Sequence, residues 1–431
     1  MKLTTTPYWW EDRPPAPDLT PQPPARTDIL VIGAGYTGLS AAIAAHDAGA
    51  NVTIVEADQP GIGASTRNGG MFGAHPRLGL ARLTKLYGQE TAEGVFSEAT
   101  PALNFVRDLQ IRENIDCDFQ QSGRIAMAWT RKDFEGLKKL AEELSSTSVK
   151  AEIIEKADLG NEVGTNLYYG GILMPQHGSL QPRKLHDGLL NAALKRGVAI
   201  VGECRVNSLE RVGGGYIAKT AKGEVRAEKV ILATNGYTDK SFPWHNRRVF
   251  PLPSYLIATE PLSPNFLSQL APGRRMMVET RARHSYYRVS PDGTRLLFGG
   301  RAAMKPIEIH KAAARLAATM AEVWPETKGV KLAHAWTGNT GYAFNHMPEV
   351  GQIDGLHYAM GFSGSGTVMA PYLGAKAAWQ AVGDPRGQTA YSGTRLRTHW
   401  LHPGGKPYFL QAADLWYQYA VDTAQNIKAR L

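Results

Sequence analysis

Residues 28–56, DILVIGAGYTGLSAAIAAHDAGANVTIVE, determine the fold expected for this chain. They begin with a short apolar run, 28–32, that predicts a buried strand. An alanine-rich stretch over 36–48 has helical spacing and ends at Gly49, a typical C-cap. A second apolar run, 51–55, predicts another strand. A strand, a glycine turn, a helix and a strand in such close succession predict a βαβ unit.

The glycine turn of this unit, GAGYTG, has the G-x-G-x-x-G spacing of dinucleotide-binding proteins. Its first glycine permits the turn, its second lets the backbone approach a pyrophosphate, and its third lets the helix pack closely on the strand. The helix N-terminus supplies free N–H groups for the phosphates. The residues expected at the pyrophosphate are Gly33, Gly35, Tyr36, Thr37 and Gly38.

Two features after the turn extend this prediction and favour FAD over NAD. Glu56, with Ala57 beside it, follows the second strand, where its carboxylate can accept hydrogen bonds from ribose hydroxyls. A second glycine-rich stretch, GIGASTRNGG at 61–70, has little side-chain bulk and can approach an extended ligand closely; a flexible surface loop is the alternative. Its candidate contacts are Gly63, Ala64, Ser65, Arg67, Asn68, Gly69, Gly70 and Met71.

The rest of the chain predicts two structural domains, because 431 residues exceed one ordinary core. The further expected elements are a helix at 182–196, a strand at 225–233, a hairpin at 285–299 and a strand-turn-helix at 356–380. We expect an α/β plus α+β fold. A discontinuous Rossmann-like FAD domain would comprise residues 1–73, 181–242 and 336–431. A substrate-binding domain on a mixed or antiparallel sheet would comprise 74–180 and 243–335.

The N-terminal segment has two unusual features. Six prolines between residues 13 and 24 predict an extended lead-in. Tyr8, Trp9 and Trp10 precede it, and we expect them to anchor this arm on the body of the same chain. An anchor on a partner subunit is the alternative, and the oligomeric state stays open.

Charge and cysteine content exclude several classes of protein. The 48 Lys and Arg residues exceed the 39 Asp and Glu residues, but they are scattered rather than clustered, so nucleic acid is not an expected partner. Surface solubilisation or attraction of an anionic ligand explains the charge. Two cysteines, Cys117 and Cys204, form neither a disulfide framework nor a metal cluster and suit the cytoplasm. No apolar run predicts a membrane span, and no secretory signal is expected.

In combination, the motifs resemble those of the D-amino-acid oxidase superfamily of FAD-dependent oxidoreductases, on the branch of γ-glutamylputrescine oxidoreductase and glycine oxidase. Besides the two glycine-rich stretches, the resemblance rests on ATNGY at 233–237, the hairpin segment 286–301, WTG at 336–338, MPEVG at 347–351 and GFSGSGT at 361–367. It implies further FAD contacts from Val206, Thr234, Asn235, Gly236, Gly361, Phe362, Ser363, Gly364, Ser365, Gly366 and Thr367.

The last of these motifs is expected to open a helix beside the flavin ring. A Gly/Ser loop there presents N–H donors and the positive end of the helix dipole, which stabilise the negative charge of reduced flavin. A helix N-cap by Ser365 or Thr367 is the compatible alternative. We expect FAD to be bound non-covalently, because neither cysteine lies in a motif like those that attach flavin in some relatives.

The resemblance implies oxidation of a primary or secondary amine. Hydride passes from the carbon beside the nitrogen to flavin N5, and the imine hydrolyses to a carbonyl compound and an amine. The electrons then pass to O2 or to an electron carrier. Thr340 and Gly364 stand where glycine oxidase has carboxylate-binding arginines, so a small-molecule amine other than an α-amino acid, such as γ-glutamylputrescine, is favoured. The alternatives are a glycine-, sarcosine- or D-amino-acid-type oxidase, an NAD(P)H-dependent reductase or monooxygenase, and a non-catalytic FAD protein.

Aromatic and basic residues of the expected substrate domain are candidates for the substrate site. Aromatic walls suit an amine through apolar contact and, if it is protonated, cation–π attraction. The candidates for catalytic residues are Tyr255, Tyr287, Arg288, Trp336 and His346, and further pocket residues are Tyr286, Phe344 and His284. Arg288 is the favoured contact for an anion, and Arg301 is the other candidate.

Overall fold

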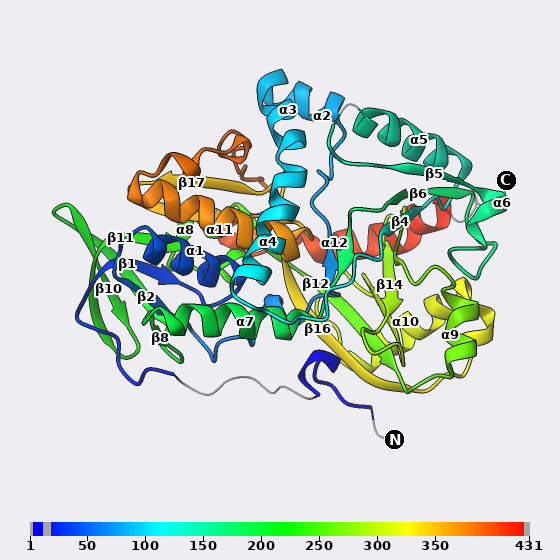
Figure 1. The fold of residues 1–431 in the computed structure, drawn as a ribbon, viewed down its shortest axis with the longest axis horizontal. Coiled ribbons are helices and arrows are strands. Elements are labelled where there is room, and N and C mark those ends of the chain that lie inside the picture. Colours follow the sequence, from blue (N-terminus) through cyan, green and yellow to red (C-terminus); the bar gives the residue numbers. More distant parts are fainter. Residues whose placement is uncertain (1–2, 12–18, 146, 426–431) are drawn as a thin grey trace.

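The computed structural model describes residues 3–11, 19–145 and 147–425. The expected proline-rich lead-in falls partly on residues 12–18, which lie outside the described residues. Figure 1 shows two sheet-based halves side by side, with β1, β2, β8, β10 and β11 in one and β4, β6, β12, β14 and β16 in the other.

The first sheet contains the predicted βαβ unit. Its strands run in the order β17, β18, β11, β1, β2, β8, and β9 and β10 extend β11 as an antiparallel meander. Strand β1 lies at the centre, parallel to both β11 and β2. The bounds are β1 Arg26–Ile32, β2 Val52–Val55, β8 Ala199–Val201, β9 Val206–Val212, β10 Gly215–Thr220, β11 Gly223–Leu232, β17 Glu349–Ile353 and β18 Leu356–Met360.

Four helices cover one face of this sheet. Helix α1 (Tyr36–Asp47) packs on α7 (Pro182–Lys195) and α11 (Gly366–Val382), and α11 packs on α4 (Ala99–Arg112). Ile29 and Val31 of β1 point into this helical layer, whereas Leu30 and Ile32 point into a second core beneath β9 and β10. The central strand is buried on both faces because successive side chains alternate between them.

The second sheet forms the other half of the molecule. Its order is β16, β12, β15, β14, β13, β4, β6, β5, and every neighbouring pair is antiparallel except β13 with β4. The bounds are β4 Arg124–Met127, β5 Glu152–Glu155, β6 Gly170–Met174, β12 Val249–Thr259, β13 Met276–Glu279, β14 Ser285–Val289, β15 Leu296–Gly300 and β16 Leu332–Ala343. Helix α10 (Ile309–Val323) covers one face of it.

In the described part of the chain, the remaining elements are a small strand pair and seven further α-helices. Strands β3 (Met71–Phe72) and β7 (Gly178–Ser179) form a small pair. The other helices are α2 Leu80–Tyr87, α3 Gln89–Ser97, α5 Arg131–Ser145, α6 Lys156–Leu159, α8 Pro243–Asn246, α9 Pro264–Leu270 and α12 Phe409–Trp416. Among the described residues, no helix combines the length and the hydropathy needed to cross a membrane.

The predicted α/β plus α+β fold class and the main predicted elements are confirmed. The helix expected at 182–196 is α7, and the strand expected at 225–233 is β11. The expected hairpin is β14 and β15. The expected boundary at residue 336 falls within β16, and α4, expected in the substrate-binding domain, packs on α11. The discontinuous division into two domains therefore remains our proposal, with α4 on the side of the first sheet.

Candidate active site

A cavity of about 780 Å³ lies between the first sheet and the second. It runs from the turn between β1 and α1 to the face of β12 and β14. The expected cofactor residues that line it are Gly33, Gly35, Tyr36, Thr37, Glu56, Ala57, Gly63, Ala64, Ser65, Arg67, Asn68, Gly69, Met71, Val206, Thr234, Asn235, Phe362, Gly364, Ser365, Gly366 and Thr367. Outside the lining are Gly38, Gly70, Gly236, Gly361 and Ser363.

The turn between β1 and α1 has the close packing that the glycine spacing predicts. Gly33 has φ +109°, a conformation that favours glycine. A Cβ at Gly38 would lie 1.8 Å from the Gly33 carbonyl oxygen. Gly38 thus lies behind the cavity wall and holds α1 against β1. A Cβ at Gly35 would lie 2.9 Å from Ser65 Oγ, so this glycine keeps open the space in front of the helix N-terminus.

Glu56 lies at the end of β2, beside this turn. Its carboxylate accepts hydrogen bonds from the backbone N–H groups of Ala34, at 2.7 Å, and Asp58, at 3.1 Å. Burial raises the pKa of Glu56, and these hydrogen bonds oppose the shift. A fixed acceptor beside a helix N-terminus suits the ribose and pyrophosphate of a dinucleotide. This half of the cavity therefore fits FAD.

Asn68 holds the second glycine-rich stretch in a defined conformation. Its amide Nδ2 donates to the carbonyl oxygens of Ala64 and Ser65, and its Oδ1 accepts from the N–H of Gly70 at 2.8 Å. Ser65 Oγ accepts from the N–H of Tyr36 at 3.0 Å, which joins this stretch to the start of α1. The stretch is therefore an ordered wall of the cavity and not a flexible surface loop.

The N-terminal aromatic residues lie against the same stretch. Trp9 is 1% exposed, and its Nε1 donates to the Asn68 carbonyl oxygen at 2.7 Å. Trp10 Nε1 donates to Thr66 Oγ1 at 3.0 Å. Trp9 also packs on Leu256 and Trp336. The prediction of an anchor on the same chain is confirmed.

The GFSGSGT motif opens α11 beside the cavity. Gly361, Ser363 and Gly364 all have positive φ, and the Gly361 N–H donates to Asn235 Oδ1 at 2.9 Å. The hydroxyl of Ser365 donates to the Phe362 carbonyl oxygen, and no side chain caps the start of α11. Ser365 thus occupies the N-cap position, as the alternative expected, but its side chain forms no capping hydrogen bond. The uncapped helix N-terminus faces the cavity, which fits the anionic edge of a reduced flavin.

Strand alternation decides which tyrosines of the second sheet reach the cavity. Tyr286 lines it, and its hydroxyl is 2.9 Å from Ser254 Oγ. Its neighbour Tyr287 points to the opposite face, is buried against α10, and is hydrogen-bonded to Tyr168 at 2.6 Å. Tyr255 lies on that opposite face too, and its hydroxyl accepts from the N–H of Ile307. Tyr255 and Tyr287 thus lie outside the cavity lining, because adjacent strand residues face opposite sides.

The other catalytic candidates also lie outside the lining. Arg288 is buried and donates to the carbonyl oxygens of Gly70 and Leu180. Trp336 donates to the Arg67 carbonyl oxygen and supports the glycine-rich stretch from behind. His346 is exposed, and Phe344 belongs to an aromatic cluster around Phe250. Arg288 and Trp336 thus support the cavity wall from behind, and none of these four side chains lines the cavity.

Several basic residues that line the cavity were not predicted as site residues. Arg77, Arg124 and His75 line it together with the expected Arg301 and His284. Tyr342, also unexpected, accepts hydrogen bonds from Arg77 at 3.0 Å and from Arg301 at 2.5 Å. Burial and the neighbouring arginines hold the pKa values of His75 and His284 well below their usual range, so both imidazoles are neutral at pH 7.

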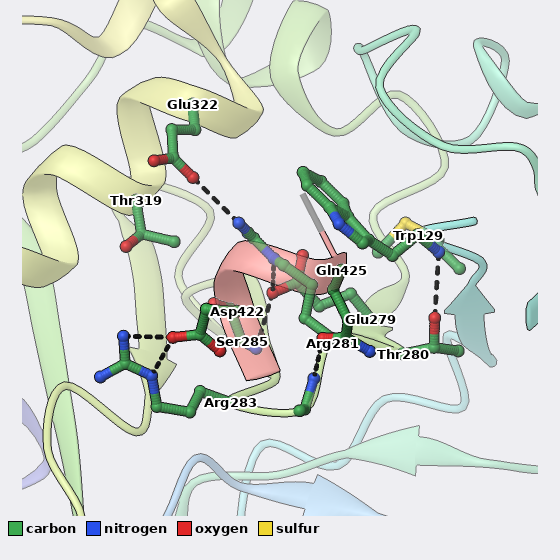
Figure 2. A network of polar contacts seen from close by, with 12 residues as sticks. Trp129, Glu279, Thr280, Arg281, Arg283, Ser285, Thr319, Glu322, Asp422 and Gln425 are labelled. Carbon is green, nitrogen blue, oxygen red and sulfur yellow. Dashed lines mark hydrogen bonds and ion pairs between the residues drawn. The ribbon is translucent and has the colours of Figure 1, made fainter. Parts of the chain in front are cut away.

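The loop between β13 and β14 lines the substrate end of the cavity and is tied to the C-terminal segment. Figure 2 shows Asp422 paired with Arg283 and Gln425 beside this loop. Gln425 Oε1 accepts from the N–H of Ala282 at 2.8 Å. Glu279 pairs with Arg281 at 2.7 Å. The C-terminal segment thus fixes a loop from which several residues line the cavity, His284 included.

Both cysteines are buried and free. Cys117 lies in the helical core, and burial raises the pKa of its thiol to about 12. Cys204 lines the cavity near Glu56. Its backbone N–H donates to the Glu56 carbonyl oxygen, and its thiol contacts Thr220 Oγ1. This is the dinucleotide end and not the substrate end, so the positions of both cysteines fit non-covalent binding of FAD.

Comparison with known proteins agrees with this geometry. Residues 28–379 match the family described as FAD dependent oxidoreductase, abbreviated DAO. The chain is 30% identical over 385 residues to γ-glutamylputrescine oxidoreductase of Escherichia coli (strain K12), covering 88% of each chain. It is 28% identical over 380 residues to the probable oxidoreductase OrdL of Rhizobium meliloti (strain 1021), covering 87% of this chain and 88% of that protein.

Among solved structures, glycine oxidase from Geobacillus kaustophilus has the same fold. It superposes with a TM-score of 0.73 at 19% identity, covering 87% of this chain and 100% of that one. The family match spans both sheets and every motif of the dinucleotide half of the cavity. The chain therefore belongs to the DAO family of FAD-dependent oxidoreductases.

Proposed function

We propose that this enzyme oxidises an amine at a C–N bond, and that the substrate binds against Tyr286, Leu256 and Tyr342. The observation that supports this best is the continuity of one cavity. The glycine cradle for FAD and this aromatic and apolar wall line the same cavity. Bound FAD supplies the electron acceptor for such a reaction.

The balance of the reaction is simple. The substrate loses a C–H hydrogen with its electron pair and one N–H proton, which gives an imine, and two electrons reduce the FAD. Water then splits the imine into a carbonyl compound and an amine. The protein's own task is to orient the substrate and to keep its nitrogen unprotonated, so that the nitrogen lone pair can assist the loss of hydride.

The residues at the substrate end suit that task. Arg77 and Arg301 place positive charge in the cavity. Like charge disfavours the protonated form of a bound amine, so its pKa falls toward neutrality. His284 is neutral and adds no charge at this end of the cavity. Tyr286 offers a hydroxyl and a ring face for positioning.

The relatives named above support a finer proposal for the identity of the amine. The 30% identity to γ-glutamylputrescine oxidoreductase supports an amine other than a simple α-amino acid. A glycine-type substrate remains the second candidate, because arginines are present at the substrate end although they come from other sequence positions. O2 or an electron carrier would accept the electrons from reduced FAD.

The test is anaerobic absorbance of the purified holoenzyme. γ-Glutamyl amines, polyamines, N-methyl amino acids, glycine and D-amino acids are added separately in the absence of NAD(P)H. Bleaching of the flavin by at least one amine is the expected result, and readmission of oxygen then separates an oxidase from a dehydrogenase. Bleaching by NADPH alone would refute amine oxidation.

A further inference from the structure

Exposed apolar side chains gather in one short segment near the C-terminus. Six of the twelve large hydrophobic residues that are exposed in the described part of the chain lie between positions 400 and 419. They are Trp400, Leu401, Tyr408, Leu415, Trp416 and Tyr419. Single exposed apolar residues are common on protein surfaces, whereas a cluster of them marks an interaction surface.

Most of this cluster forms one stripe along α12, which continues into a π-helical turn, Tyr417–Val421. The exposed residues recur at intervals of three and four positions, which places them on one face of the helix. Trp416 is 65% exposed and Tyr419 is 69% exposed. The residues of this outer stripe of α12 are Tyr408, Ala412, Leu415, Trp416 and Tyr419.

The opposite face of α12 is already covered. It packs in a core with Phe250 and Tyr342. The members of this core from α12 and its continuation are Phe409, Leu410, Ala413 and Tyr417. Tyr342 also lines the cavity, so α12 lies between the substrate end of the cavity and the outer stripe. A helix that is apolar on two faces needs a partner for each, and the described residues cover only one of them.

The loop before α12 carries the most exposed ring of this group. Trp400 is 81% exposed, and its ring centroid lies 5.8 Å from that of His399. The His399 ring stacks on Phe344 at 5.3 Å, and the Phe344 ring lies 5.8 Å from that of Phe409. This series of rings holds the loop against the start of α12.

The exposed charges of the same segment are all basic. The exposed basic residues between positions 395 and 425 are Arg395, Arg397 and Lys406. The two carboxylates of this stretch have partners within the chain. Asp414 is buried and accepts from the N–H of Met304, and Asp422 pairs with Arg283. The loop and α12 therefore present apolar rings together with uncompensated positive charge.

This charge decides between the possible occupants of the outer stripe. A second copy of the chain would bring the same basic residues, and their mutual repulsion disfavours pairing of two such faces. An anionic lipid surface complements the charge, and Trp and Tyr side chains favour the interface between lipid and water. An apolar helix stripe accompanied by basic residues is typical of helices that lie on a membrane surface.

We propose that the outer stripe of α12, with Trp400 and the basic residues of the preceding loop, binds the surface of an anionic lipid bilayer. The rings enter the headgroup region, and Arg397 and Lys406 contact lipid phosphates. Binding is peripheral, because α12 lies in the plane of the surface. This inference goes beyond amine oxidation and does not depend on it. It places the substrate end of the cavity about one helix diameter, roughly 10 Å, from the lipid.

Co-sedimentation of the holoenzyme with lipid vesicles tests this surface. Vesicles of phosphatidylcholine alone are compared with vesicles of phosphatidylcholine and phosphatidylglycerol, at low and at high ionic strength. Each of three basic residues should favour the anionic surface about five-fold, so we expect binding to the anionic vesicles to be on the order of 100-fold tighter. High ionic strength should remove most of this difference.

Substitutions on the exposed face locate the contact. Trp416→Gln combined with Tyr419→Gln should weaken binding about 10- to 100-fold, as expected for one large apolar side chain that is no longer buried. Lys406→Gln should weaken it about five-fold at low ionic strength only.

Matched controls come from exposed residues elsewhere. Ile111→Gln removes an exposed apolar side chain from α4, and Arg226→Gln removes an exposed charge from β11; neither should change binding. FAD content and circular dichroism check that each variant is folded.

Three results would overturn the inference. The first is equal binding to neutral and anionic vesicles at low ionic strength, or no binding to either. The second is unchanged vesicle binding in the folded variant of Trp416 and Tyr419, which would place the contact on another face. The third is a dimer in sedimentation velocity that this variant loses, without vesicle binding, which would identify the outer stripe as an interface between two copies of the chain.

Discussion

Replacing Gly38 with alanine should displace helix α1 from strand β1 and weaken FAD binding. The added Cβ would lie 1.8 Å from the carbonyl oxygen of Gly33 and 3.1 Å from Cγ1 of Val31. Contacts below 3.0 Å essentially never occur for a Cβ, so helix and turn must separate by about 1.2 Å. The backbone atom involved belongs to the cofactor turn, which has no flexible side chain to yield.

The expected magnitude follows from this displacement. A hydrogen bond near 2.9 Å that lengthens by about 1.2 Å is lost. Hydrogen bonds to charged groups contribute about 1.5–3 kcal/mol each, so loss of two from the helix N-terminus to the pyrophosphate weakens FAD binding by at least about 3 kcal/mol, or roughly 150-fold. Overpacking should also destabilise the folded chain by about 1–3 kcal/mol.

Fluorescence titration of the apoprotein with FAD measures this loss, and thermal unfolding measures the change in stability. Gly136→Ala in α5 is the matched control, since nothing lies within 4 Å of the added Cβ. That variant should keep its FAD affinity and gain up to about 1 kcal/mol in stability. If Gly38→Ala binds FAD as tightly as the unmodified protein, the role assigned to this glycine is refuted.

Three further changes test other parts of the structure. His177 is fully buried and its pKa lies well below its usual range, so below pH 6.5 the unfolded chain binds more protons than the folded chain. Acidification should therefore lower the free energy of unfolding by up to about 1.4 kcal/mol per pH unit. His177→Leu should reduce this pH dependence, measured by thermal unfolding from about pH 5 to 7.5. Trp9→Ala should lower the free energy of unfolding by about 3–5 kcal/mol and reduce the FAD content, because the indole packs in a core and donates to the Asn68 carbonyl oxygen. An unchanged FAD content would refute a role of Trp9 in supporting the cofactor loop. Asp422→Asn removes the ion pair with Arg283 and should raise KM more than it lowers kcat, while the free energy of unfolding falls by less than about 1 kcal/mol. An unchanged KM would show that the C-terminal segment does not influence substrate binding.

The cofactor half could be predicted because its chemistry is local in sequence. A strand, a glycine turn and a helix within about 30 residues determine both the geometry and the ligand. The observed helix Tyr36–Asp47 and strand Val52–Val55 differ from the expected ranges by one residue at one end. Trp9 and Asn68 were also identified from sequence, although only the structure shows their contact.

The substrate half could not be predicted to the same depth. Tyr286 and Tyr287 are adjacent in one strand, so only one of them can face the cavity, and residue type does not say which. Arg77 reaches Gly364 across 287 positions of sequence, a proximity that depends on how the loop after β3 meets α11. Arg288 is the favoured anion contact from sequence, but it is buried outside the cavity lining, and its Nη1 donates to the backbone carbonyl oxygens of Gly70 and Leu180.

The N-terminal anchor has a consequence for how this enzyme is made. Thr4 forms an isolated β-bridge with His334, and Trp9 contacts Trp336 and the second glycine-rich stretch, at Asn68. The two partners leave the ribosome roughly 15 to 65 seconds apart at about 5–20 residues per second. During that interval the indole of Trp336, which donates to the Arg67 carbonyl oxygen, and helix α11 do not yet exist. We therefore expect capture of FAD to be a late event of biosynthesis, and the anchor to be completed only after residue 336 of 431 has been translated.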